Sequence, residues 1–126
     1  MKKIAFYICL TGLIIKALEC DAQDPKYVYT VGGGGTSTAD NIPATSADLS
    51  NARGISVDEY GNIYLARNLK VSKINTVTGY ITNLAGSGLA TTGGDGGPAT
   101  AAGVKSMGLQ VHGNSLIIAG YISNHI

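Results

Sequence analysis

The 126-residue chain has no tryptophan, little charge and few aromatic residues, and these shortages exclude several classes of protein. Nine Lys and Arg stand against eight Asp and Glu, so a strongly basic nucleic-acid binder and an acidic tail are both excluded. A charged fraction of 13% is also too low for a coiled coil or a disordered polyelectrolyte. Glycine is abundant, with 18 residues, which favours many tight turns in one small domain.

Residues 1–22 have the pattern of a secretory signal peptide. Met1 and two lysines give a positive start, and a mostly apolar run follows at 4–15. As a helix this run would span about 18 Å, well short of the roughly 30 Å hydrocarbon core, so it does not predict a membrane anchor. Small residues at Cys20 and Ala22 predict cleavage after Ala22. We therefore expect a secreted, periplasmic or cell-surface protein.

Both cysteines, Cys9 and Cys20, lie within this predicted leader. One alternative is a lipoprotein acylated at Cys20, but Glu19 stands where a small residue is wanted. Another alternative is an ordinary apolar strand or helix at the N-terminus. Cleavage would leave residues 23–126 without a thiol, and therefore without a disulfide, a cysteine-ligated metal or a cysteine nucleophile.

Residues 27 onward repeat, with the first match offset by 53 positions. The matched pairs are Tyr27–Val31 with Tyr80–Leu84, Pro43–Thr45 with Pro98–Thr100, Gly54–Val57 with Gly108–Val111, and Gly61–Ala66 with Gly113–Ala119. Several correspondences in one order are hard to obtain by chance. The domain 23–126 therefore divides into one unit at about 27–79 and an incomplete unit at about 80–126.

Within the repeat the signals are those of short β-strands, at 55–58, 63–66, 71–74 and 80–85. Gly61 and Gly79 stand where the connecting turns require positive φ. Four antiparallel strands in a unit of this length predict an all-β fold made of β-propeller blades. Only the two Pro-Ala-Thr segments are suited to a helical turn begun by proline.

Three spaced motifs resemble the NHL repeat, a propeller-blade family: Gly54–Asp58, Gly61–Ala66 and Val71–Ile74. The segment Gly93–Ala102 is similar to the long interblade loop of secreted bacterial NHL-repeat proteins, and Asn124-His125 falls near the place of the Asn-His pair of the motif. The resemblance implies a partial propeller of about two four-stranded antiparallel blades. It implies no particular activity, because this scaffold carries unrelated functions.

The chain is shorter than the resemblance implies, because a propeller needs several blades to close. Each open blade face would expose on the order of 400 Å² of apolar surface, which costs roughly 10 kcal/mol at 25 cal/mol/Å². We therefore expect a fragment, a truncated product, or a chain that needs further blades or self-association. The free strand edges would lie at Tyr27–Val31 and at 122–126.

Candidate metal ligands are few. Asp95 lies among glycines and offers one carboxylate, whereas calcium takes six to eight oxygens, so a turn is the favoured interpretation. His112 and His125 have no nearby pair of acids and would make a poor zinc site. We interpret His112 as a polar turn residue before Gly113-Asn114. The sequence thus predicts no metal site and no cofactor.

Candidate catalytic residues are equally few, and none forms a recognised motif. Asp58 is expected to accept turn N–H bonds rather than a substrate proton. Arg53 and Arg67 lie at strand ends, where propellers bind ligands, but we interpret both as solvated surface residues.

The function expected from the sequence is a noncatalytic scaffold that binds a protein or a glycan, with no nucleic-acid partner and no membrane span. Two alternatives stay open. The chain is either part of a lyase-like propeller enzyme whose active site lies in other blades, or a nonfunctional truncated product.

Overall fold

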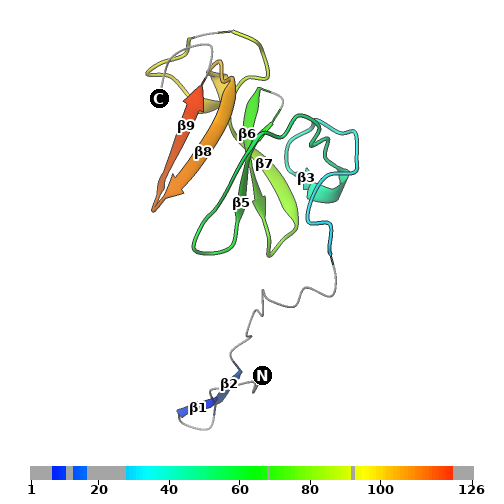
Figure 1. Ribbon diagram of the computed structural model, residues 1–126, viewed down its shortest axis with the longest axis vertical. Helices are drawn as coiled ribbons and strands as arrows, with labels where there is room; N and C mark the ends of the chain where they lie inside the picture. Colours follow the sequence, from blue (N-terminus) through cyan, green and yellow to red (C-terminus); the bar gives the residue numbers. More distant parts are fainter. Residues whose placement is uncertain (1–6, 11–12, 17–27, 68, 92, 121–126) are drawn as a thin grey trace.

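The computed structural model describes residues 7–10, 13–16, 28–67, 69–91 and 93–120 (Figure 1). Its elements are β1 (Tyr7–Leu10), β2 (Leu13–Lys16), β3 (Ile42–Pro43), the 3₁₀ turn η1 (Ala44–Ser46), β4 (Gly54–Val57), β5 (Ile63–Arg67), β6 (Lys70–Asn75), β7 (Tyr80–Ala85), the 3₁₀ turn η2 (Ala99–Ala101), β8 (Ser106–His112) and β9 (Ser115–Gly120). The described part is built of antiparallel strands, which confirms the all-β fold.

Two of these strands lie inside the predicted leader. β1 pairs with β2 in an antiparallel two-stranded sheet, with Tyr7 opposite Lys16 and Leu10 opposite Leu13. Cys20 and Ala22 lie outside the described residues, so cleavage and export stay predictions. In the described part of the chain, no helix is long and apolar enough to cross a membrane.

The main sheet has the strand order β3-β7-β6-β5-β4. β4 to β7 are the four strands expected from the sequence, and each neighbouring pair is antiparallel. The turn glycines adopt the predicted backbone conformation, with φ of 82° at Gly61 and 74° at Gly79. The N–H of Gly79 donates to the carbonyl of Asn75 at 2.8 Å, which closes the β6–β7 turn. The expected meander is therefore correct.

The core lies on one face of this sheet. Side chains alternate between the two faces of a strand, so Ile63 and Leu65 of β5 point to the same side. The buried cluster comprises Ala44, Ala47, Leu65, Ile74 and Ile81, and the half-buried Ile42, Leu49 and Ile63 pack against it. The segment that contains β3 and η1 therefore covers this face (Figure 1).

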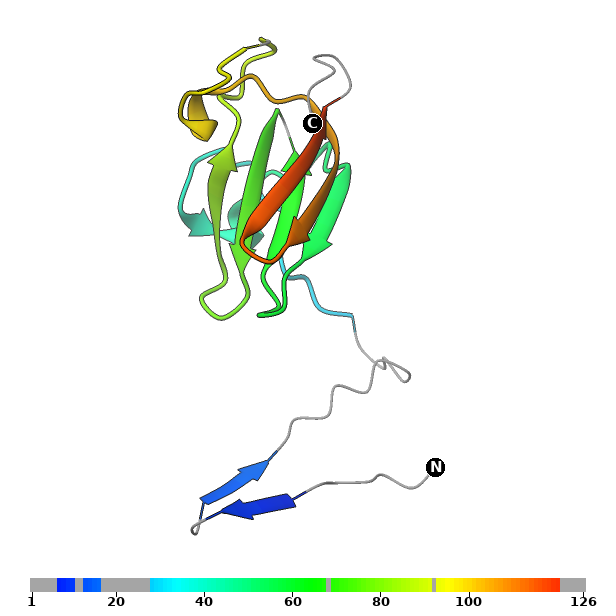
Figure 2. The same ribbon diagram turned by 90° about the vertical axis from the view of Figure 1, so that its left-hand side faces the viewer.

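The β8–β9 hairpin packs on the opposite side of the sheet, against β4 and β5 (Figures 1 and 2). A Cβ added to Gly54 would lie 3.2 Å from the Cα of Gly108, so the backbones of β4 and β8 approach closely there. The Val111 N–H donates to the Ser56 hydroxyl at 3.1 Å. The absence of a side chain at Gly54 is thus what lets the hairpin sit against β4.

The two Pro-Ala-Thr segments fold in the same way. η1 follows Pro43, with φ −53° and ψ 129°, and η2 follows Pro98, with φ −59° and ψ 131°. The carbonyls of Ala44 and Ala99 accept the backbone N–H of Gly33 and Gly86, each at 2.9 Å. The predicted proline-initiated turns are therefore confirmed as two 3₁₀ turns with matching hydrogen bonds.

One predicted strand is wrong. The expectation placed a strand at Tyr27–Val31, but residues 28–31 form no strand, and Val28 is 98% exposed. Their repeat partner β7 has β6 on one edge and β3 on the other, whereas residues 28–31 have no paired strand in the described ranges. A strand forms only where a neighbour completes its backbone hydrogen bonds. The free edge expected at 122–126 lies outside the described residues.

Candidate functional site

Arg67, at the end of β5, is buried, with 2% of its surface exposed. Its Nε donates to the Ser72 hydroxyl at 3.1 Å, and a terminal nitrogen donates to the Asp48 carbonyl at 2.9 Å. The Ser72 hydroxyl donates in turn to the Asn83 side-chain oxygen at 2.8 Å. The interpretation of Arg67 as a solvated residue is therefore wrong, because the alternation that buries Leu65 also turns Arg67 inward.

Arg67 makes no direct ion pair with a carboxylate of the described residues. Burial lowers the pKa of the Arg67 guanidinium, and the nearby carboxylates of Asp48 and Asp40 oppose this by favouring the charged form. Arginine stays protonated in proteins at any physiological pH. Arg67 therefore contributes a permanent buried positive charge to this end of the sheet.

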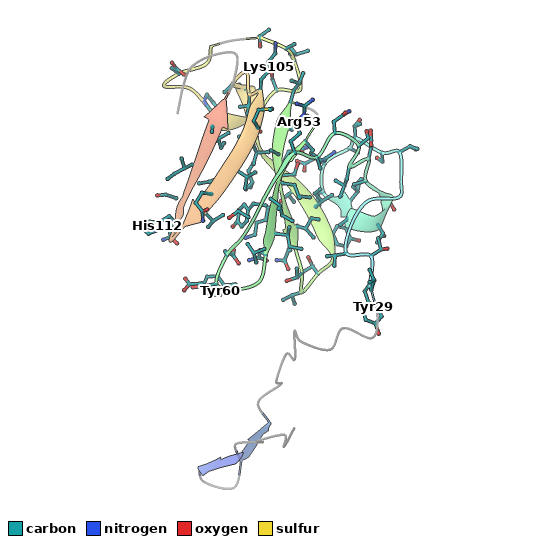
Figure 3. The ribbon with its side chains drawn as sticks, viewed as in Figure 1. Tyr29, Arg53, Tyr60, Lys105 and His112 are labelled. Atoms are coloured by element: carbon teal, nitrogen blue, oxygen red, sulfur yellow. The ribbon has the colours of Figure 1, made fainter. Side chains whose placement is uncertain are left out.

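Beside Arg67 lies a cavity of about 220 Å³, which we call the cationic pocket. Three basic residues from different parts of the chain line it: Arg53, Arg67 and Lys105. Figure 3 shows Arg53 and Lys105 at the same end of the molecule. The polar residues Asn51 and Ser106 complete its charged and polar wall, and among the described residues no acidic side chain lines it.

Among the described residues, Arg53 has only a weak side-chain hydrogen-bond acceptor and Lys105 has no hydrogen-bond or ion-pair partner. Arg53 is exposed and donates from one terminal nitrogen to the Met107 sulfur at 3.2 Å. A thioether is a weak acceptor, so most donors of this guanidinium are available. Lys105 is half-buried and makes no hydrogen bond or ion pair with the described residues. The interpretation of Arg53 as a solvated residue agrees with its exposure.

Two residues of the pocket wall have unusual backbone angles. Among the described non-glycine residues, φ is positive at Asn41, Asn51 and Leu69, and both Asn51 and Leu69, each at 62°, line the cationic pocket. Asparagine tolerates this conformation, but leucine rarely adopts it. A Cβ on Gly86 would overlap the Leu69 carbonyl, so glycine at this position permits the close approach of the two segments. Tertiary contacts thus hold the wall in a strained shape.

Asp58, at the opposite end of β5, behaves as the sequence predicts. One carboxylate oxygen accepts the N–H groups of Tyr60 and Asn62, at 3.0 and 2.8 Å. The other accepts the Asn62 amide at 2.9 Å and the Tyr64 hydroxyl at 3.1 Å. Burial raises the pKa of Asp58, but these hydrogen bonds outweigh it, and the net effect is a lowered pKa. Its acceptor capacity is used inside the turn.

A larger cavity of about 530 Å³ lies between the tip of the β4–β5 turn and the β8–β9 hairpin. Its wall includes Tyr64, Lys73 and Leu84, on the part of the sheet that the hairpin leaves uncovered. The Lys73 ammonium lies 5.5 Å from the centre of the Tyr64 ring, a cation–π contact. Asp58 and Lys73 are both engaged locally, and the wall also contains the polar residues Glu59, Tyr60, Asn114 and Ser115.

The remaining candidates do not converge. His112 is exposed and directly precedes the hairpin turn, where Gly113 has φ of 54°, in agreement with its interpretation as a turn residue (Figure 3). Asp95 lies in an exposed turn closed by the Gly97 N–H on the Gly94 carbonyl at 3.1 Å. His125 lies outside the described residues. Within the described ranges, no three His, Cys, Asp or Glu side chains gather closely enough to hold a metal ion.

The sequence interpretation named Arg53 and Arg67 but missed Lys105 and the pocket that the three share. Arg67 had a usable signal, because it follows Ile63 and Leu65 at two-residue spacing and so belongs to their face. Lys105 had none, since its approach to Arg53 depends on how β8 packs against β4.

No protein-family model and no curated protein sequence matches this chain.

Proposed function

We propose that this chain is an exported, noncatalytic binding scaffold built from NHL-like propeller units, which engages a glycan or a protein through the loop ends of its strands. Residues 1–22 would be the leader and residues 23–126 the binding domain.

The observation that carries the proposal is the contact between matched positions of the two units. Gly54 and Gly108 occupy the same place in the repeat, and they meet where β4 and β8 approach. Blades packed around a common axis bring equivalent inner strands together in this way. The two matching 3₁₀ turns support the same arrangement.

A binding role is favoured over catalysis by the state of the polar side chains. Asp58, a carboxylate in the wall of the larger cavity, has its oxygens occupied by the turn and has a lowered pKa. A general acid or base at neutral pH needs a carboxyl pKa that is raised. The available side chains are instead the cations of the cationic pocket, which suit recognition.

The test is a binding screen with the full-length chain produced in an exporting bacterial host. N-terminal sequencing of the exported protein should give Gln23 as the first residue. Arrays of glycans and proteins should then retain it, and mass spectrometry should show that bound ligands keep their mass. Retention of Met1, turnover of a ligand, or the lack of any retained ligand would each contradict part of the proposal.

A further inference from the structure

We propose that the cationic pocket binds the carboxylate of a uronic-acid residue in an acidic polysaccharide. This inference rests on the proposed function as a binding scaffold and names its ligand class. The pocket is formed by Arg53, Arg67 and Lys105, which packing brings together from three separate positions in the chain.

The charge in the pocket calls for an anion. The wall carries three cations, and no described acidic side chain lines it. Arg67 is fixed by its bonds to Ser72 and Asp48 and carries a buried positive charge beside the cavity. The guanidinium of Arg53, bonded only to the Met107 sulfur, keeps a planar set of donors that matches a carboxylate. Lys105 supplies a third positive charge.

The size of the cavity selects one charged group. Pockets that enclose a whole small ligand measure about 300–1,000 Å³, whereas this one measures about 220 Å³. It therefore accommodates a carboxylate and the adjoining part of one sugar ring, with the rest of the chain outside. Ser106 lies in the same wall, and its hydroxyl is suited to a sugar hydroxyl.

The wall also argues against a nucleic acid. No described aromatic side chain lines the pocket, so a base has no ring on which to stack. The strained backbone at Asn51 and Leu69 sets the shape of the pocket before any ligand arrives. A preformed wall lowers the ordering cost of binding.

The experiment titrates the full-length exported chain with trigalacturonate and with its methyl-esterified form, which has the same sugars without the charge. We expect binding of the acid, binding of the ester at least about tenfold weaker, and weakening of the acid complex as salt rises. Arg53→Ala and Lys105→Ala should each weaken binding about tenfold. Lys73→Ala removes a cation outside the pocket and should bind as the unmodified protein does.

Each other outcome has a defined meaning. Equal binding of the ester, or an equal loss with Lys73→Ala, would overturn the carboxylate site. Tighter binding of a hexaglutamate peptide would overturn the assignment to a glycan. If the arrays retain a ligand whose binding neither Arg53→Ala nor Lys105→Ala weakens, the inference fails while the scaffold function stands. If the arrays retain nothing, the scaffold function itself fails. Thermal melting of both variants checks that they fold, which the exposure of Arg53 leads us to expect.

Discussion

At one end of β5, Asp58 is bonded by residues that follow it within six positions along the chain. At the other end, Arg67 is bonded by Ser72, by the Asp48 carbonyl and by Asn83, which lie 5 to 19 positions away on three segments. Both ionised groups are satisfied. The first network needs only its own turn, whereas the second exists only when β6, β7 and the segment before β4 are in place.

The difference explains why basic residues gather around one cavity at the Arg67 end. The Asp58 turn satisfies the Asp58 carboxylate with its own hydrogen bonds. The Arg67 end collects three cations without an acid among the described lining residues, because β8 brings Lys105 beside residues contributed by the first unit.

The largest effect is expected from Arg67→Ala. The change removes the donors to the Asp48 carbonyl and Asn83 and leaves a cavity in a buried site, so the free energy of unfolding should fall by about 3–4 kcal/mol. Urea unfolding measures it. Arg53→Ala, at an exposed residue of the same pocket, should change it by no more than about 0.5 kcal/mol. Similar losses in the two variants would contradict the buried network.

The next largest effect is expected at two glycines: Gly86, which lies against Leu69 of the cationic pocket, and Gly79 in the β6–β7 turn. At Gly86, φ is 90° and a Cβ would overlap the Leu69 backbone, so Gly86→Ala should lower the free energy of unfolding by about 2–3 kcal/mol. At Gly79, φ is 74° but nothing lies within 4 Å of an added Cβ. Gly79→Ala should therefore cost only about 1 kcal/mol, the strain of the backbone conformation alone. Denaturant curves with equal costs would remove the distinction between the assembled end and the local turn.

The smallest effect is a pH dependence at Asp58. Its pKa in the folded state is lowered, so its contribution to stability is fully present above the ordinary carboxyl pKa of about 4 and is lost as pH falls through the lower folded-state pKa. Thermal melting between pH 2 and 7 should therefore show a steeper acid loss for the unmodified protein than for Asp58→Asn. Glu59→Gln, in the same turn, serves as the control. Equal slopes for the Asp58→Asn variant and the unmodified protein would show that the turn does not depend on the ionised carboxylate.

Much of the fold could be predicted because its signals are local. Alternation over 63–66 and glycines at positions 61 and 79 set the strands and turns, and β5, β6 and β7 appear where expected. The strand predicted at Tyr27–Val31 is absent at residues 28–31, although the sequence match of this segment to β7 is also a local signal. A strand also needs a neighbour, and similarity of sequence does not supply one.

The candidate site was less predictable for a related reason. From the sequence, Arg53 and Arg67 are expected at strand ends, and both are interpreted as solvated surface residues. Exposure depends on what covers a side chain, and only Arg67 has the core-face segment over it.

The sequence by itself determined the all-β class, the strand meander, the repeated proline turns and the hydrogen bonding of Asp58, because each depends on residues a few positions apart. Only the tertiary structure decided that Arg67 is buried and that Lys105 joins Arg53 in one pocket. The burial of Arg67 depends on β6, β7 and the segment before β4, which supply its hydrogen-bond partners. The position of Lys105 depends on the packing of β8 against β4, where the close approach of Gly54 and Gly108 brings segments more than fifty residues apart into contact.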